Sequence, residues 1–276
     1  MDPRKSFPKK IKDLFQVLLA EGCRTSSDSA VERKIRMMLF AAYLLVGILC
    51  ATVIYFLTRP CLFSLIWPLV SDDVDKGLAR EKLALFRDKG EIKGDVLEIG
   101  AGVGANVKYY DPAKVTSLIL NEPCVRMHKN LRDVVSSASP ALLACTKIIG
   151  GGAEDLKNIK TKSVDVVVCT LVLCSVADPV QVLQEVQRVL RDGGRFVFME
   201  HVAAPKGTNL RSRQDFWNPC WTCLPLDGCR VNVETDKMIE RMKGFVVVGE
   251  MQRFEDDSGP RIAAPTVAGV VRTVNT

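Results

Sequence analysis

The chain has 276 residues, of which 47% are hydrophobic and 25% are charged, and its net charge is +6. This composition excludes collagen-like, low-complexity and fully disordered proteins. The basic excess lies mostly in residues 1–36, a polar segment, whereas residues 71–276 are nearly neutral. We therefore expect no nucleic-acid substrate, because binding to phosphates requires a basic working surface. The 10 cysteines lack the spacing of a disulfide scaffold, which favours a reduced, cytosol-facing domain.

An apolar block follows the basic segment. Residues 37–57 contain no charged side chain, and a helix of that length would reach about 30 Å, the thickness of a bilayer core. Arg59 and Pro60 are expected to break this helix before a second apolar run at 61–70. Residues 37–70 therefore predict a membrane anchor, either as a single span or as a hairpin. We favour a re-entrant hairpin or a helix lying in one leaflet, either of which keeps both ends cytosolic.

The remainder, residues 72–276, is predicted to be one α/β domain. It begins with an amphipathic helix at 72–90, and strands then alternate with helices. Apolar strands that alternate with helices indicate a parallel sheet covered on both faces. Strands are expected at 95–99, 115–120, 146–150, 164–170, 195–201, 245–250 and 267–272, and helices at 104–110, 124–138, 179–191 and 234–243.

A glycine-rich turn follows the first predicted strand. Gly100, Gly102 and Gly104 permit a tight turn in which the backbone can approach a ligand closely. Glu122, just after the second strand, is placed to bind a pair of ribose hydroxyls. The spacing also fits the dinucleotide fingerprint, so the loop alone leaves NAD(P) and S-adenosylmethionine open.

Three later segments decide between these cofactors. GGGAEDL at 150–156, SVDVVVC at 163–169 and LRDGGRFVFMEH at 190–201 occur in this order. They resemble the adenine-contacting segment, the fourth strand and the hairpin into the fifth strand of class I S-adenosylmethionine-dependent methyltransferases. Residues 163–204 and the stretch FWNPCW to LDGC at 216–229 further resemble the membrane-bound alkyl-thiol S-methyltransferases, the methyltransferase-like seven family.

The resemblance implies a fold, a cofactor, a location and a substrate class. It implies a Rossmann-like, seven-stranded, mostly parallel sheet with helices on both faces, and S-adenosyl-L-methionine as the cofactor. It also implies anchoring at the endoplasmic reticulum or lipid droplets and methyl transfer to small alkyl thiols. The cofactor contacts that it implies are Glu98, Gly100, Gly102, Gly104, Glu122, Ala153, Glu154, Thr170 and Leu171.

His201, at the end of the fifth strand, is the best candidate for a general base. It could equally be a partly buried histidine satisfied by a carbonyl group. Alkyl thiols with a pKa of about 8.5 are already partly ionised at pH 7, so a strong base is not required. His128, inside a predicted helix, is expected on the surface.

Cysteines and tryptophans cluster near the predicted substrate pocket. Cys220, Cys223 and Cys229 offer three thiols within ten residues, but no matching second pair follows, so no metal is expected. Cys174, Trp217 and Trp221 are predicted to line the pocket, the tryptophans as part of an apolar lid, although the aromatic side chains could instead contact the bilayer interface.

These patterns predict a membrane-anchored methyltransferase that acts on a small lipophilic acceptor, with an alkyl thiol favoured. The expected partners are this substrate and membrane lipid. Methylation of an oxygen or carbon atom of a lipid or quinone is the alternative reaction, because the same fold supports it. A non-catalytic cofactor-binding protein of the membrane or lipid droplet, and a nicotinamide-dependent dehydrogenase, are the remaining alternatives.

Overall fold

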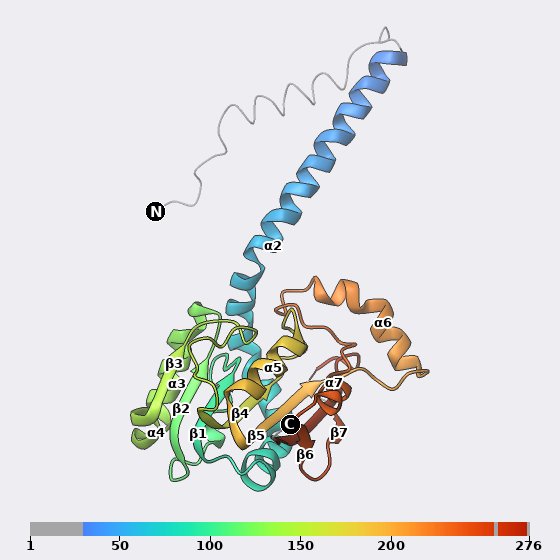
Figure 1. Ribbon diagram of the computed structural model, residues 1–276. Helices are drawn as coiled ribbons and strands as arrows, with labels where there is room; N and C mark the ends of the chain where they lie inside the picture. Colours follow the sequence, from blue (N-terminus) through green and yellow to red (C-terminus); the bar gives the residue numbers. More distant parts are fainter. Residues whose placement is uncertain (1–29, 257–258, 275–276) are drawn as a thin grey trace, which may run out of the picture. The chain divides into compact units, whose positions relative to one another are not determined.

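The structure is a computed structural model that describes residues 30–256 and 259–274 (Figure 1). Most of the polar, basic segment expected at residues 1–36 lies outside the described residues. By its contacts the chain divides into residues 1–57 and residues 58–276, and the second unit contains the sheet and the cavity described below.

Helix α2 (Ala30–Leu83) contains both apolar runs. Within the described residues, Lys34–Arg59 is the single helical stretch long and apolar enough to cross a membrane by length and composition, with a mean hydropathy of 2.5. The predicted break at Arg59 and Pro60, and with it the hairpin, is wrong, because the helix continues through both residues. A proline removes only one N–H donor, and the long helical segments on either side can tolerate that loss.

The predicted helix at 72–90 is divided between two elements. Its first part is the end of α2, and it continues as the π-helical segment η1 (Ala84–Lys89). Leu78, Leu85 and Phe86 are buried against the sheet, as the amphipathic pattern predicts, whereas Leu83, expected on the same face, is 38% exposed.

The sheet has eight strands in the order β3-β2-β1-β4-β5-β8-β6, with β7 paired to β8. The first five strands in this order are parallel, whereas β8 runs antiparallel to β5, β6 and β7. All seven predicted strands are present. The short β7 was not predicted, because three of its four residues are exposed and it lacks an apolar pattern. The bounds are β1 (Gly94–Ile99), β2 (Val115–Asn121), β3 (Thr146–Ile149), β4 (Val164–Thr170), β5 (Leu190–His201), β6 (Phe245–Val247), β7 (Gln252–Glu255) and β8 (Pro265–Thr273).

Helices cover the sheet and connect its strands (Figure 1). In α5, Asp178 accepts hydrogen bonds from the backbone N–H groups of Val180 and Gln181, which fixes the start of this helix as its capping pattern predicts. Neither α4 nor α6 was predicted, and the helix expected at 104–110 is only the short η2. The bounds are η2 (Val107–Tyr109), η3 (Val125–Met127), α3 (His128–Ala138), α4 (Pro140–Cys145), α5 (Pro179–Val189), α6 (Asn209–Thr222) and α7 (Thr235–Arg241).

Strand β4 separates two clusters of buried side chains. Val166 and Val168 pack in one cluster with residues of η1 and α3, whereas Val167 and Cys169 pack in the other with residues of α5 and α7. This alternation is the two-residue period of a strand buried on both faces. The layers hold the carboxyl ends of the parallel strands at one edge, where α/β proteins place their ligands.

Candidate functional site

A cavity of about 620 Å³ lies at the carboxyl ends of β1, β2, β4 and β5. The glycine loop and the segments after β2 and β4 line one part of it, and His201 lies in its wall. Apolar side chains of α2 and of the stretch after α6 complete the lining. Several lining residues were not indicated by the sequence. They include the apolar residues Phe63, Ile66, Trp67, Val70 and Val74, and the acidic residues Asp227 and Asp256. Phe63, Ile66, Trp67 and Val70 belong to the second apolar run, where nothing in the sequence distinguishes them from lipid-facing residues, and Val74 lies in the amphipathic helix that follows.

The glycine loop presents bare backbone to the cavity. Gly100 and Gly102 line it and have φ angles of 66° and 57°, in the left-handed region that favours glycine. A Cβ atom on Gly100 would overlap Val172, and one on Gly102 would lie 3.0 Å from Trp67 Nε1. Gly104 does not line this cavity, and a Cβ atom there would press against Leu131 of α3 at 3.0 Å.

Glu122 is held in place by the backbone around it. Its Oε2 accepts a hydrogen bond from Gly102 N at 2.8 Å, and its Oε1 accepts one from Cys124 N at 2.7 Å. Burial raises the pKa of this carboxyl, although the two N–H donors oppose the shift. The carboxylate retains acceptor capacity for hydroxyl groups of a ligand.

His128 supports Glu122 and is half-buried rather than on the surface. Its Nε2 donates a hydrogen bond to the Glu122 carbonyl oxygen at 2.7 Å. The helical position alone gave no indication of this contact.

Glu98 lies behind the loop and not in the cavity wall. It is 1% exposed, and it accepts hydrogen bonds from Asn106 Nδ2 at 2.9 Å and from the Tyr110 hydroxyl at 2.6 Å. Burial raises its pKa. Asn106 also donates to Thr170 Oγ1 at 2.8 Å, so this side chain connects Glu98 to the end of β4.

The segments after β3 and β4 contribute the next part of the wall, including Ala153, Glu154, Thr170 and Leu171. Leu171 has a φ angle of 58°, and its N–H donates to the Met199 carbonyl oxygen at 2.8 Å. A non-glycine residue in this region is strained, and such residues concentrate at functional sites. Glu154 Oε1 accepts from Ala177 N at 3.0 Å, which joins the two segments.

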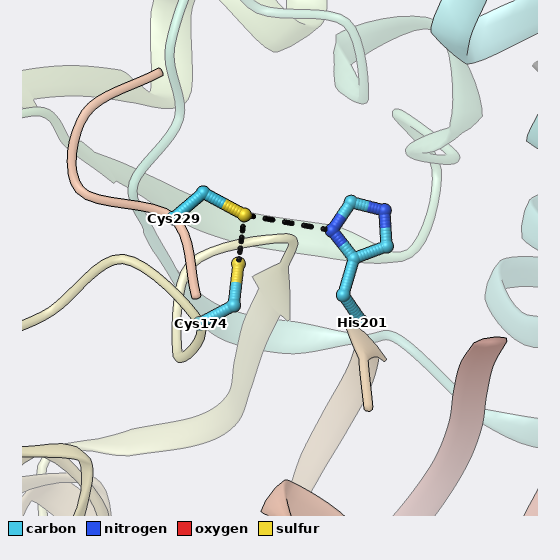
Figure 2. A group of neighbouring side chains, drawn as sticks. All are labelled: Cys174, His201 and Cys229. Atoms are coloured by element: carbon cyan, nitrogen blue, oxygen red, sulfur yellow. Dashed lines mark hydrogen bonds between the residues drawn. The ribbon is translucent and has the colours of Figure 1, made fainter. Parts of the chain in front are cut away.

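Cys174, His201 and Cys229 converge in another part of the cavity wall (Figure 2). Cys229 Sγ lies 3.7 Å from Cys174 Sγ and 4.0 Å from His201 Nδ1. The hydrogen bond with Cys174 lowers the pKa of Cys229, and His201 adds to this effect. Burial opposes the charged form of His201, but Cys229 and nearby carboxylates outweigh it and raise the pKa of this histidine. The hydrogen bond with Cys229 and burial both raise the pKa of Cys174.

Backbone contacts hold Cys229 in this position. Asp227 and Gly228 form a turn with positive φ angles of 52° and 79°. Arg230 N then donates to the Cys174 carbonyl oxygen at 2.9 Å, and Arg230 Nη2 donates to the Val176 carbonyl oxygen at 2.6 Å. The stretch after α6 is thereby attached to the segment after β4.

The structure places some residues of the predicted lid and of the predicted thiol group in the cavity wall and leaves others exposed on the surface. Trp221, Leu224 and Leu226 line the cavity. Trp217 is 52% exposed and is not part of the lining. Cys220 and Cys223 are also exposed, whereas Cys229 lies with two partners that are distant in the sequence.

Known proteins resemble this chain in sequence and in fold. Residues 97–198 match the family model described as a methyltransferase domain. Thiol S-methyltransferase TMT1B of Rattus norvegicus is 40% identical over 185 residues, which are 64% of this chain and 72% of the relative. Thiol S-methyltransferase TMT1A of Homo sapiens is 38% identical over 193 residues, 68% of this chain and 72% of that protein. The crystal structure of the YcgJ protein of Bacillus subtilis matches at 16% identity with a TM-score of 0.53, covering 71% of this chain and all of that one, which shows the fold alone.

The cavity fits the cofactor of this family. Two glycines with positive φ angles leave room for close approach of a ligand, and Glu122 offers a carboxylate oriented by backbone donors. These are the features with which open α/β sheets bind nucleosides. The chain belongs to the family of the thiol S-methyltransferases TMT1A and TMT1B and is a class I methyltransferase that depends on S-adenosyl-L-methionine.

Proposed function

We propose that the chain is a membrane-anchored thiol S-methyltransferase that acts on small lipophilic thiols. The observation that carries this proposal is one continuous cavity, whose lining includes Gly102 and Glu122 together with His201 and a set of apolar side chains. We assign its Gly102 and Glu122 part to the cofactor and its His201 part to the acceptor. The relatives TMT1A and TMT1B are named as thiol S-methyltransferases, which supports the thiol as the acceptor class.

In this proposal, Gly100, Gly102 and Glu122 hold the methionine and ribose parts of the cofactor. Ala153 and Glu154 lie beside the adenine, and Thr170 and Leu171 line the methyl-donor end. S-Adenosylmethionine supplies a methyl group on a positively charged sulfur. Glu98 and Gly104 act indirectly, Glu98 through Asn106 and Gly104 by its close packing on α3.

The acceptor end binds the alkyl chain and excludes water. Phe63, Ile66, Trp221, Leu224 and Leu226 supply its apolar wall, and each buried CH₂ group of a substrate contributes about 0.8 kcal/mol. His201 is the proposed proton acceptor. For a thiol with the pKa of a cysteine side chain, about 8.5, full ionisation at pH 7 costs about 2 kcal/mol, and a simple alkyl thiol costs more because it is less acidic.

We further propose that the Lys34–Arg59 helix anchors the enzyme in the endoplasmic reticulum, with the catalytic domain in the cytosol. The buried cysteines Cys169, Cys174 and Cys229 are thiols outside any disulfide, which suits a reducing compartment. A continuous helix of this length suits a bilayer, whereas residence on a lipid droplet requires it to lie within a monolayer. Protection of the domain from added protease in sealed microsomes would contradict the cytosolic orientation.

The test uses the full chain in detergent, methyl-labelled S-adenosylmethionine and acceptors that share one alkyl chain but end in a thiol, alcohol, phenol or amine. We expect label on the thiols alone, and a KM that falls about four-fold for each added CH₂ until the cavity is full. Label on the alcohol or phenol would favour O-methylation. Binding of S-adenosylmethionine without transfer to any acceptor would favour a non-catalytic protein.

A further inference from the structure

We propose that Cys174, His201 and Cys229 form a zinc site with one open position, to which the acceptor thiol binds as a thiolate. This inference rests on the proposed function, because it specifies how the acceptor end of the cavity takes its substrate. It replaces the expectation, drawn from the sequence, that the chain holds no metal, and it makes His201 a zinc ligand in place of the proton acceptor named above.

The spacing of the three donor atoms suits one zinc ion. The donor atoms of Cys174, His201 and Cys229 all lie within 4.8 Å of one another. Two sulfurs bound tetrahedrally at about 2.3 Å from zinc lie roughly 3.8 Å apart, and a sulfur and a nitrogen roughly 3.6 Å apart. The two cysteine sulfurs are 3.7 Å apart, and Cys229 Sγ is 4.0 Å from His201 Nδ1 (Figure 2). Shifts of a few tenths of an ångström in the side chains would complete the site.

The donor set and its surroundings suit a catalytic rather than a structural site. Two thiolates and one imidazole are zinc ligands, and three protein ligands leave the fourth tetrahedral position open. All three residues line the cavity, so the open position faces the space assigned to the acceptor. Cys174 is 1% exposed and Cys229 is 8% exposed, which keeps competing water scarce.

The site is also held firmly before any ion binds. His201 is the last residue of β5, and Met199 of the same strand accepts a hydrogen bond from Leu171 N. Arg230, the residue after Cys229 in the chain, donates its backbone N–H to the Cys174 carbonyl oxygen. Fixed backbone on all sides is what a precise ligand geometry requires.

The charges and protons balance at such a site. Binding of the ion releases the two cysteine protons to solvent, and two thiolates with a neutral imidazole cancel the charge of Zn²⁺. The acceptor thiol loses its proton to solvent as its sulfur takes the fourth position, because a coordinated thiol is deprotonated outright. The thioether product carries no negative charge and is a weaker ligand, so it can leave. Soft sulfur would be preferred over an alcohol oxygen of the same chain length.

The sequence pattern concealed this group because its members are far apart in the chain. Cys229 lies 55 residues from Cys174 and 28 residues from His201. Cys220 and Cys223, the neighbours that suggested a zinc motif, are exposed and do not belong to the group.

The test measures metal on the tag-free full chain, purified in detergent under reducing conditions. We expect one zinc per chain, and after exchange with Co²⁺ the charge-transfer absorption of thiolate-bound cobalt. Cys174→Ser, Cys229→Ser and His201→Gln should each weaken Co²⁺ binding at least ten-fold, whereas the matched control Cys220→Ser should bind as the wild type does. Binding of S-adenosylmethionine by each variant verifies that it is folded.

A second readout concerns the acceptor. A long-chain alkyl thiol should change the ligand-field absorption of the cobalt protein, and the alcohol of equal length should not. Wild-type protein that transfers methyl groups to thiols without bound zinc, and that gives no thiolate–cobalt band, would overturn the zinc site and leave the proposed function intact. A disulfide between Cys174 and Cys229 in the active enzyme would overturn it as well. Bound zinc without methyl transfer to any thiol would instead contradict the proposed function.

Discussion

The two proposed binding regions of the cavity, the cofactor end and the acceptor end, are built in different ways. At the cofactor end, Gly100 and Gly102 contribute bare backbone, and backbone N–H groups orient Glu122. At the acceptor end, three reactive side chains from separate segments meet, and only tertiary contacts such as that of Arg230 N with Cys174 bring them together. The cofactor end therefore depends on local chain geometry, whereas the acceptor end depends on long-range packing.

The difference predicts how each end tolerates change. A ligand common to many enzymes can be held by backbone groups, which substitutions of side chains do not remove. The acceptor end can change its chemistry by exchanging a few side chains while the sheet stays the same. The five predictions below separate the two ends, or test the support that α2 gives to the first of them.

The largest effect is expected at Asp75 of α2, which binds the hydroxyl group of Tyr109 in η2, the element that follows the glycine loop. Its Oδ1 accepts from buried Lys82 at 2.7 Å, and its Oδ2 accepts from the Tyr109 hydroxyl at 3.0 Å. Asp75→Asn should lower the free energy of unfolding by about 3–5 kcal/mol, because it leaves the Lys82 charge buried without a partner. Denaturant unfolding in detergent measures this, with Asp73→Asn as the control, because the Asp73–Lys76 pair is exposed. Equal effects of the two substitutions would contradict the prediction.

Glu122→Gln tests the oriented carboxylate. Hydrogen bonds to a charged group are worth about 1.5–3 kcal/mol, so the Kd for S-adenosylmethionine should rise roughly 10- to 150-fold. Isothermal titration calorimetry measures this. Asp133→Asn, which removes an exposed carboxylate from α3, should leave the Kd unchanged. An unchanged Kd for Glu122→Gln would remove this residue from the cofactor site.

Gly102→Ala tests whether the bare backbone of the loop matters beyond its conformation. Gly207, with a φ angle of 84° and nothing within 4 Å of a Cβ atom, is the matched control. Both substitutions incur a strain of about 1–2 kcal/mol, but only Gly102→Ala places a methyl group in the cavity. The affinity for S-adenosylmethionine should fall at least ten-fold for Gly102→Ala and less than two-fold for Gly207→Ala. Equal losses would mean that strain alone is responsible.

A pair of tryptophans tests the acceptor end. Trp221 lines the cavity and Trp217 does not, although both lie on α6. Trp221→Ala should raise the KM for a long-chain thiol about ten-fold, a loss of about 1.4 kcal/mol of apolar contact, with little change in the cofactor Kd. Trp217→Ala should change neither constant in detergent. A lid formed by both residues would instead raise KM in both variants.

The smallest effect is the pH dependence at Asp75. Burial would raise the pKa of this carboxyl, but hydrogen bonds from Lys108, Lys82 and Tyr109 outweigh it and lower the pKa. A carboxyl with a lowered pKa stabilises the fold above its unfolded value of about 3.9, and the contribution is lost as the pH falls through the folded pKa. The stability difference between wild type and Asp75→Asn should therefore shrink below about pH 4. A constant difference from pH 7 to pH 3 would contradict this.

Some elements could be predicted because their determinants are close together in the chain. Asp178, Pro179 and the buried face of α5 specify that helix within a dozen residues. The apolar strand β4 and the glycine loop after β1 are local patterns too, and they indicated the α/β fold and a nucleoside cofactor, whereas the choice of S-adenosylmethionine needed the resemblance of the segments between residues 150 and 201 to methyltransferases. Strand β7 and helix α6 escaped prediction, because their sequences carry little apolar periodicity and contacts with the rest of the domain stabilise them.

The sequence by itself therefore determined the α/β sheet, a nucleoside-binding loop and a helix apolar enough for a membrane, because periodicity, turns and glycine positions act over short stretches of chain. The resemblance of residues 150–201 to methyltransferases then identified the methyl-donor cofactor. Only the tertiary structure decided that α2 continues through Pro60, that Glu98 lies behind the loop, that Trp217 lies outside the cavity and that Cys229 joins Cys174 and His201. These outcomes depend on contacts between residues tens of positions apart, which arise only when the sheet brings its strand ends to one edge.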